Sequence, residues 1–279
     1  MIEIMSSAKY HADPAPEPSL SSSIAKILLR ESPYKARHSH PRLNPSYRED
    51  HDSKFDLGTC AHAVLLENDS SRIVIVKADD WRTKAAKEAR NAAWSNDKTP
   101  LLERHHDAVM VMVGAARAFL EDCEITEYWN EGESEVSVIW QEDDIYLRCR
   151  PDRLATNRRC IVDYKSTTDA APDAFGRQIV RMGYHWQDAF YRRGLRAETG
   201  RDPAFVFLAQ SVEPPHECSL VGCDAALREI ADAEVERAVQ IWHECITTDQ
   251  WPTYDNRIHW TLPAMWQIKE HEQRIMEEA

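Results

Sequence analysis

Two acidic residues and a lysine near the middle of the chain have the types and spacing needed for metal-dependent hydrolysis. Asp152 follows a proline, and ten intervening residues separate it from the run Asp163-Tyr164-Lys165. The apolar, partly β-branched residues just before this run predict a short strand. Asp163 and Lys165 would then project from one face, with the Tyr164 carbonyl between them. Two acids and a lysine at a strand end can hold a divalent metal and handle the proton of a water, as phosphodiester hydrolysis requires.

Composition narrows the class of protein that could carry this chemistry. With 279 residues, 43% of them hydrophobic, the chain can bury a sizeable core. A net charge of −13 argues against a protein that coats nucleic acid with its whole surface, but allows a local basic channel. There is no apolar run of membrane-spanning length and no signal-peptide pattern, and the seven cysteines lack paired spacing. We therefore expect a cytoplasmic protein without a membrane partner.

The residues ahead of the acidic motif predict an arm followed by helices. Residues 1 to about 18 are polar and interrupted by proline, so we expect a flexible, loosely held arm. Serines before residue 24 are candidate caps for a short helix over 24–28. Small and apolar residues over 58–67 predict a packed helix with His62 in its first turn. Helical periodicity recurs over two later ranges, 81–94 and 100–121.

Three segments around the acids show the alternation of β-strands. They cover residues 135–140, 145–148 and 160–165, and polar turns separate them. We therefore expect a three-strand meander that carries the carboxylates of Glu135, Asp152 and Asp163.

The second half of the chain predicts a long helix and then further sheet. The helix would run from Pro172 to Gly200 and present Gln187 and Tyr191, four residues apart, on one face. An apolar strand follows at 203–209, in a position typical of a sheet centre. A partner strand is expected at 218–222 and a helix at 225–246, capped by Asp224.

This order of elements predicts the fold class. It is a mixed α/β (α+β) chain with a central mixed sheet flanked by helices. We expect one domain over residues 1–279, with a helical, tryptophan-rich C-terminal extension over about 224–279. Trp260 and Trp266 of this extension could pack in the core, at a subunit interface or against a partner protein.

Each motif is common by itself, but their order resembles that of the PD-(D/E)XK nuclease superfamily. The branch in question has an upstream helix histidine and a downstream Gln-x-x-x-Tyr. The matching motifs are GTCAHAVLLE around His62, RPD at 150–152, DYK at 163–165 and QDAFY at 187–191. The likeness extends to the exodeoxyribonuclease VIII (RecE) nuclease domain and its phage relatives through LSSSIAKILLRESP, EVSVIW and DYKSTTDA, and covers roughly residues 10–195.

The resemblance implies an activity, a cofactor and partners. It implies Mg²⁺-dependent digestion of linear double-stranded DNA from its ends, 5′ to 3′, leaving 3′ single strands for recombination. Mn²⁺ would substitute for Mg²⁺. The partners would be DNA ends, further copies of the chain in a ring (a tetramer rather than a trimer) and a single-strand annealing protein. An endonuclease, a single-strand nuclease and an inactive DNA-binding or scaffolding relative remain alternatives.

The resemblance also suggests metal ligands. Asp152 would anchor the metals, Asp163 and the Tyr164 carbonyl would complete one metal site, and His62 would serve a second. Glu135 would act by a hydrogen bond behind the ligands or through water. An iron–sulfur cluster is not expected, because the C-terminal cysteines are too widely spread.

The remaining site residues would act on the water and the phosphate. Lys165 would orient a metal-bound water, help to deprotonate it and compensate phosphate charge. Gln187 and Tyr191 would position the water, the phosphate or Lys165. Two basic stretches, 35–48 and 177–196, could line a DNA channel, although both are also compatible with solvated surface. The candidate DNA contacts are Lys35, Arg37, Arg150, Arg177, Arg181 and Arg192.

Overall fold

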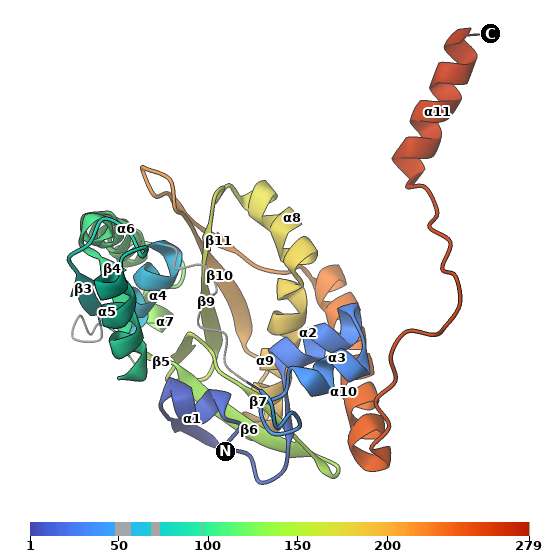
Figure 1. The fold of residues 1–279 in the computed structure, drawn as a ribbon, viewed down its shortest axis with the longest axis horizontal. Helices are drawn as coiled ribbons and strands as arrows, with labels where there is room; N and C mark the ends of the chain where they lie inside the picture. Colours follow the sequence, from blue (N-terminus) through green and yellow to red (C-terminus); the bar gives the residue numbers. More distant parts are fainter. Residues whose placement is uncertain (48–56, 68–72, 97, 279) are drawn as a thin grey trace.

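The computed structural model describes residues 1–47, 57–67, 73–96 and 98–278, and it contains three β-sheets with helices around them (Figure 1). A five-stranded sheet has the order β11-β10-β9-β8-β5, a four-stranded sheet has the order β1-β6-β7-β2, and β3 and β4 form a pair. Helices α4, α5 and α6 lie on one side of the five-stranded sheet, and α8, α9 and α10 lie on the other. This architecture confirms the predicted mixed α/β class.

The five-stranded sheet carries the DYK motif on a buried central strand. Its β9 pairs antiparallel with β8 and parallel with β10, as a mixed sheet requires. Successive residues of β9 face different cores: Ile161 packs among α2, α8 and α9, whereas Val162 packs with α4 and α6. The bounds are β5 Gly132–Ser134, β8 Arg153–Ala155, β9 Cys160–Thr167, β10 Ala204–Ser211 and β11 Cys218–Val221. The predicted central strand and its antiparallel partner are confirmed in β10 and β11.

The expected three-strand meander is wrong in its connectivity. Strands β6 and β7 form the predicted hairpin in the four-stranded sheet. After β7 the chain crosses through Pro151-Asp152 to the five-stranded sheet, where it continues as β8. Sequence alternation locates strands, whereas the choice of sheet partner depends on packing that alternation does not encode. The bounds in this sheet are β1 Ile2–Ile4, β2 Ser19–Ser21, β6 Val136–Glu142 and β7 Ile145–Cys149.

The expectation of a loose N-terminal arm is also wrong. Strand β1 pairs with β6, and α1 (Ser7–His11) buries Tyr10. Asp13 is buried and accepts hydrogen bonds from Ser19 N at 2.9 Å and Ser19 Oγ at 2.6 Å. It also pairs with Arg148 at 3.0 Å. A network of buried polar groups holds this segment, and hydrophobic periodicity gives no signal for such a network.

The helices agree with the sequence in type more than in boundary. His62 lies in the second turn of α4, because that helix begins at Leu57. Strand β4 occupies the first residues of the range predicted as the helix 100–121, and it pairs with β3, which was not predicted. The bounds are α2 Ser22–Arg30, α3 Pro33–His38, α4 Leu57–Glu67, β3 Ile73–Val76, α5 Lys84–Ser95, β4 Thr99–Leu102, α6 Glu103–Glu121 and α7 Thr126–Asn130.

The long helix predicted from Pro172 to Gly200 is two helices. These are α8 (Pro172–Met182) and α9 (Tyr184–Thr199), and they meet at Gly183, whose φ of 68° ends the first helix. An added Cβ there would lie 2.6 Å from the Trp186 ring, so the junction has no room for a side chain.

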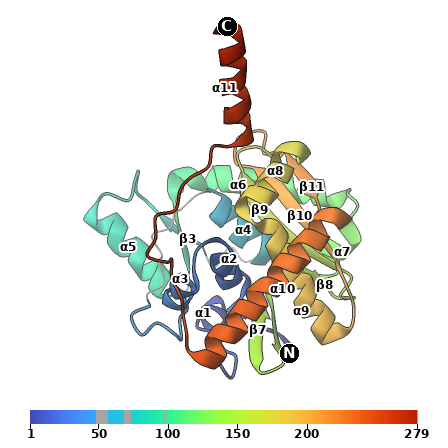
Figure 2. The ribbon, with the colours of Figure 1, turned by 90° about the vertical axis from the view of Figure 1, so that its right-hand side faces the viewer.

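The C-terminal extension begins later than expected. Helix α10 (Ala225–Thr248) packs on α2 and α9 with Trp242 fully buried, and is therefore part of the domain body (Figure 2). Its predicted cap is confirmed by the hydrogen bond from Leu227 N to Asp224 Oδ1. Among the described elements, α11 (Met265–Glu278) and the segment before it stand away from the body (Figure 1). Trp260 and Trp266 are 83% and 62% exposed, so neither packs in this chain's core.

Candidate active site

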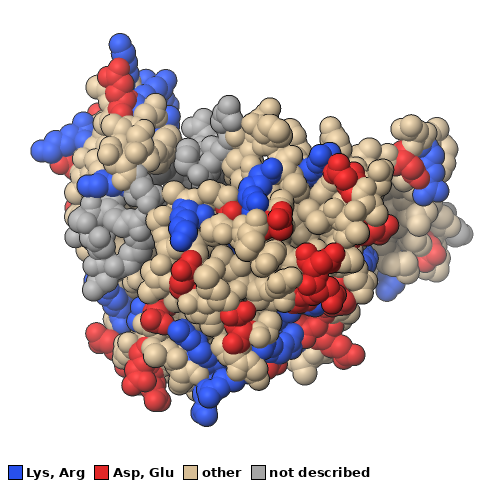
Figure 3. Space-filling model, turned by 90° about the horizontal axis from the view of Figure 1, so that it is seen from below, with Lys and Arg blue, Asp and Glu red and all other residues tan. Residues whose placement is uncertain are grey.

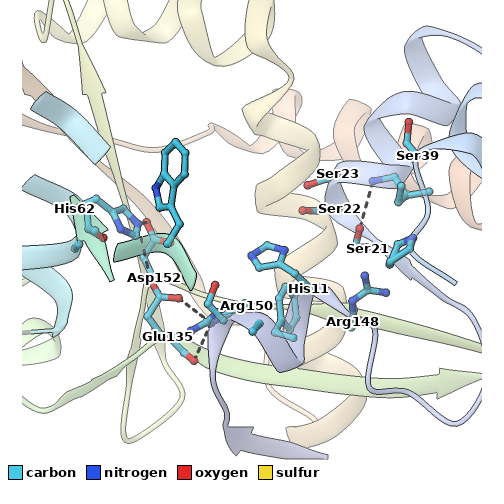
Figure 4. A pocket seen from close by; sticks show the side chains of 18 of the residues that line it. His11, Ser21, Ser22, Ser23, Ser39, His62, Glu135, Arg148, Arg150 and Asp152 are labelled. Carbon is cyan, nitrogen blue, oxygen red and sulfur yellow. Dashed lines mark hydrogen bonds and ion pairs between the residues drawn. The ribbon is translucent and has the colours of Figure 1, made fainter. Parts of the chain in front are cut away.

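His62, Glu135 and Asp152 meet at one point between three separate parts of the chain (Figure 4). Helix α4 supplies the histidine, the residue before β6 supplies the glutamate, and the link from β7 to β8 supplies the aspartate. His62 Nε2 lies 3.2 Å from Asp152 Oδ2 and 4.0 Å from Glu135 Oε1. One ligand atom from each residue falls within 4.8 Å of the other two. The three side chains could therefore share a metal ion.

Glu135 is held by its backbone as well as by its side chain. It has a φ of 57°, uncommon for a residue with a side chain, and its N–H donates to the Asp152 carbonyl at 3.0 Å. Arg150 pairs with Glu135 Oε2 at 2.7 Å, which leaves Oε1 on the side of His62. The sequence placed Glu135 behind the ligands, whereas the structure places its carboxylate beside them.

Asp152 links this cluster to the central strand. It is buried, and its Oδ2 accepts a hydrogen bond from the Tyr164 N–H at 2.8 Å. The Tyr164 side chain faces α4, where its ring centroid lies 6.0 Å from that of His62 and its hydroxyl donates to Gln210 Oε1 at 2.6 Å. Tyr164 therefore contacts both Asp152 and His62. A metal-binding role for its carbonyl stays a prediction.

Asp163 and Lys165 lie next to the cluster of His62, Glu135 and Asp152. They project from the face of β9 opposite to the one that carries Tyr164. Asp163 is fully buried, forms an ion pair with Lys165 and accepts a hydrogen bond from Gln187 Nε2 at 2.7 Å. Gln187 therefore orients the Asp163 side chain, whereas the sequence had suggested the water, the phosphate or Lys165 as the group that it positions. Tyr191, one turn further along α9, is buried and lines the same cavity as His62 and Asp152.

The close approach of these charges shifts the pKa values of the two acids in opposite directions. Burial, reinforced by the negative charge of Asp152, raises the pKa of Asp163 to about 6. Burial also acts to raise the pKa of Asp152, but the nearby positive charges of His62 and Lys165 outweigh it and lower that pKa.

The two basic groups show the converse balance. Burial lowers the pKa of His62, but Asp152 and Glu135 raise it more, so that it ends above the ordinary value. Burial likewise opposes the charge on Lys165, yet Asp163 and Asp152 raise its pKa overall. Lys165 is therefore protonated at neutral pH, which favours charge compensation over the proton-accepting role considered from the sequence.

The donor set suits a hard divalent cation. One imidazole nitrogen and two carboxylates converge, and the acidic Asp163 stands next to them. Mg²⁺ and Mn²⁺ bind such oxygen-rich sets and keep several waters for substrate to displace. His62, Glu135 and Asp152 would hold the ion, and Asp163 is placed to join them.

A cavity of about 790 Å³ opens from this cluster toward the N-terminal segment (Figure 4). Beyond Glu135 and Asp152 it is lined by Arg150 and Arg148, and then by the serines 21–23 at the start of α2. Arg148 is only 3% exposed, and its Nε has no hydrogen-bond partner. The guanidinium carbons of Arg148 and Arg150 lie over the Tyr10 ring, at 5.5 and 5.6 Å from its centroid. The cavity therefore combines guanidinium and hydroxyl groups that can donate hydrogen bonds to an anion, while Asp13 and Glu135 balance the charges of the two arginines.

The other predicted DNA contacts lie at different places. Arg150 lines the cavity, Arg177 and Arg181 are exposed on α8, and Lys35 is exposed on α3. Arg37 lies over the Trp251 ring at 5.9 Å. The C-terminal end of the basic stretch 35–48 lies outside the described residues.

Arg192 is not available for DNA, contrary to the prediction. Its side chain is 2% exposed and pairs with Asp188 and also with Asp202 and Asp232, at 3.4 and 2.9 Å. Charge along a helix does not reveal which arginines face the core, and three acidic partners satisfy this one.

Arg148 and Tyr10 are cavity residues that sequence reasoning missed. A signal for Arg148 existed, because it stands two residues before Arg150 at the end of a predicted strand and so shares its face. Tyr10 gave none, since it reaches the site through the polar N-terminal network.

Comparison with known proteins assigns a family. The model of a "PDDEXK-like domain of unknown function (DUF3799)" matches residues 21–260, a range that includes every residue of the metal cluster and the Asp163–Lys165 pair. The chain belongs to this family. The predicted membership of the PD-(D/E)XK superfamily is thereby confirmed. No curated protein matches the chain.

A solved structure shares the fold of this family member. It is the crystal structure of a "putative exonuclease" from Eubacterium rectale, similar at a TM-score of 0.58 and 11% sequence identity. The match covers 95% of this chain and 97% of that chain. Within the described ranges, no helix is both long enough and apolar enough to span a membrane.

Proposed function

We propose that this chain is a metal-dependent exonuclease that digests linear double-stranded DNA from its 5′ ends and leaves 3′ single strands for recombination. The observation that carries the proposal is the buried Asp163–Lys165 pair beside the convergent ligand atoms of His62, Glu135 and Asp152. Family membership supports nuclease chemistry in general. The choice of substrate and polarity rests on the cavity and on the likeness to exodeoxyribonuclease VIII.

The roles of the residues follow from their contacts. Mg²⁺ or Mn²⁺, when bound, supplies charge neutralisation at the phosphate and acidity to a water. Lys165, protonated and fixed by Asp163, presents positive charge to the scissile phosphate and orients the attacking water. Gln187 keeps Asp163 in one rotamer through its 2.7 Å hydrogen bond. Arg150 fixes the Glu135 carboxylate in the orientation that leaves Oε1 toward His62.

Attack from a 5′ end is supported by the shape and charge of the cavity. A terminal phosphate carries more negative charge than an internal one, so it gains more from two arginines. Arg148 and Arg150 lie along the cavity that also contains the ligand cluster, and Ser22 and Ser23 add hydroxyl donors. A terminal nucleotide held there would place the next phosphate toward His62 and Asp152.

A comparison of DNA ends tests this function. A 5′-phosphorylated linear duplex, its 5′-hydroxyl form, a closed circle and a single strand would be incubated with Mg²⁺, with Mn²⁺ and with EDTA. We expect the phosphorylated duplex to be degraded on the order of tenfold faster than the hydroxyl form, which corresponds to one good charge-assisted contact. EDTA should abolish degradation.

Each rival activity has its own pattern in this assay. Cutting of the closed circle would indicate an endonuclease, and cutting of the single strand alone would indicate a single-strand nuclease. DNA binding without cleavage under any metal would indicate an inactive scaffold. Any of these three results would contradict the proposed function.

A further inference from the structure

A second lysine lies next to the site on the side of α2. Lys26 Nζ is 5.4 Å from the centroid of the Tyr184 ring, and Lys165 Nζ is 5.2 Å from the centroid of the same ring. The Tyr184 ring therefore lies close to the amino groups of both lysines. Lys26 is half-buried in this position, so its amine is held near the reaction centre by packing.

Arg30 continues this line of positive charge by one helical turn. Its guanidinium lies over the Trp186 ring at 5.0 Å and donates to the carbonyl of Arg181 at 2.6 Å. The hydrogen bond joins the end of α2 to the end of α8, where Arg177 and Arg181 are exposed one turn apart on the same face. These four cations, Lys26, Arg30, Arg177 and Arg181, form what we call the α2–α8 strip.

Among the described residues, the strip lacks the carboxylate partners that several other cations have. Across the described ranges, no carboxylate lies within 4.0 Å of the charged atoms of Lys26 or Arg30, whereas Arg148, Arg150 and Arg192 each have one. Burial first, and then the positive charges of Lys165 and Arg30, lower the pKa of Lys26 to about 8, while the negative charge of Asp163 opposes this shift. Lys26 is half-buried and Arg30 is exposed, and neither has a carboxylate partner among the described residues, so both can still pair with an anionic ligand.

We propose that Lys26 and Arg30 form a phosphate subsite for DNA, separate from the arginine-lined cavity, and that the α2–α8 strip guides the DNA backbone away from Lys165. The inference rests on the proposed nuclease function. It assigns a role to two residues of α2 that lie outside the RPD, DYK and QDAFY motifs and outside the metal cluster. Phosphate is the class of ligand that fits, because the strip is a row of spaced cations without base-reading groups.

Substitution of Lys26 gives a test in which charge and packing are separated. Lys26→Met keeps an unbranched side chain against Tyr184 and removes the charge, while Lys26→Arg keeps the charge. Lys87→Met, at an exposed position on α5, is the matched control for loss of one positive charge. Binding of a fluorescent 5′-phosphorylated duplex would be measured by anisotropy with Ca²⁺ over a series of salt concentrations, and cleavage with Mg²⁺ in parallel.

The expected result is weaker DNA binding with a shallower salt dependence. Lys26→Met should weaken binding on the order of tenfold and reduce the slope of log K against log salt by about one, as loss of one phosphate contact predicts. Lys26→Arg should keep both values close to those of the wild type, and Lys87→Met should match the wild type. The thermal unfolding of all variants should coincide.

Two results would overturn the inference, and they are distinguishable. If the wild type binds and cuts DNA but Lys26→Met has the same affinity and salt slope, the subsite is wrong and the proposed function stands. If the wild type neither binds nor cuts DNA, the proposed function fails and the subsite fails with it.

Discussion

Asp163 is the residue at which protons and a metal ion would compete most directly. Burial and the charge of Asp152 raise its pKa to about 6, and His62 beside it also has a raised pKa. Each of these two side chains can bind a metal ion only after it has lost its proton. The raised pKa values therefore make protons compete with the metal at a higher pH than they would for free side chains. A divalent cation would replace the proton on each, so metal binding should release protons.

Metal affinity should fall as the pH falls through the pKa of Asp163. At about pH 8 Asp163 is ionised, and at about pH 5 both it and His62 are protonated, so Mn²⁺ binding should weaken on the order of tenfold or more. Isothermal titration at the two pH values, in buffers of different ionisation enthalpy, measures the affinity and the proton release. Asp163→Asn is the control, since it should reduce the pH dependence. Equal affinity at both pH values would contradict this assignment.

At the residue scale, the sequence predicted which side chains converge better than it predicted their roles. His62, Asp152, Asp163 and Lys165 do meet, because each stands on an element whose type the local pattern indicates. The contact between Glu135 and His62 could not be predicted, since it depends on a positive φ and on a hydrogen bond to the Asp152 carbonyl. The burial of Arg192 depends on contacts with Asp188, Asp202 and Asp232, which are 4, 10 and 40 residues away in the sequence.

At the scale of elements, the junction of α8 and α9 fixes the position of Gln187. Gly183 turns the chain with a φ of 68°, and an added Cβ would lie 2.6 Å from Trp186. Gln187 comes four residues later, at the start of α9, and its hydrogen bond to Asp163 depends on that start.

Gly183→Ala should therefore destabilise the protein, by about 1–3 kcal/mol from backbone strain and crowding together. Gly176→Ala, within α8 and with nothing within 4 Å of the added methyl group, is the matched control. It should leave stability unchanged or raise it by up to about 1 kcal/mol. Denaturant unfolding measures both. Equal stability of the two variants would show that the junction is not strained.

The elements themselves were largely predictable, and the sheets were not. The strands around Val138, Tyr146 and Asp163 all exist, because alternation and β-branching are local properties. Their division between two sheets and the capture of residues 2–4 by β6 are non-local. Proline and polar composition suggested a loose N-terminus, while a buried aspartate, Asp13, holds it in place.

At the scale of the whole molecule, the net charge of −13 limits where a nucleic acid could bind. Acidic and basic side chains are intermingled over the face seen in Figure 3, with no basic coat across it. An enzyme that acts on DNA with a net charge of −13 needs its cations where the phosphates lie, and the remaining negative charge discourages binding elsewhere. The arginine-lined cavity and the α2–α8 strip are two such groups of cations beside the candidate site.

The C-terminal arm is the part of the molecule most separable from the fold. Beyond Trp251, which packs against Trp242, the exposed apolar side chains include Ile258, Trp260 and Leu262. We propose that the chain assembles into a homo-oligomer, in keeping with the ring expected from the resemblance, and that this arm contributes to it.

Removal of residues 255–279 should leave the thermal unfolding midpoint of the domain body unchanged and lower the number of copies in the assembly. Both follow if the arm contacts other copies and not its own core. Light scattering with calorimetry measures the two quantities, and Gln267→Ala in the full chain is a control that removes no large apolar group. A truncated protein with as many copies per assembly as the full chain, or with a much lower unfolding midpoint, would contradict the proposed role of the arm.

The central claim is that His62, Glu135, Asp152, Asp163 and Lys165 form one metal-dependent hydrolytic site. Release of nucleotides from a linear duplex with Mg²⁺ tests it most directly, in the wild type, in Asp163→Ala, in Lys165→Ala and in Asp173→Ala, an exposed control on α8. We predict cleavage by the wild type and the control, none in EDTA, and a loss of about a thousandfold or more in the two site variants, with the fold unchanged. Near-normal cleavage by either site variant, or cleavage by the wild type in EDTA, would contradict the account.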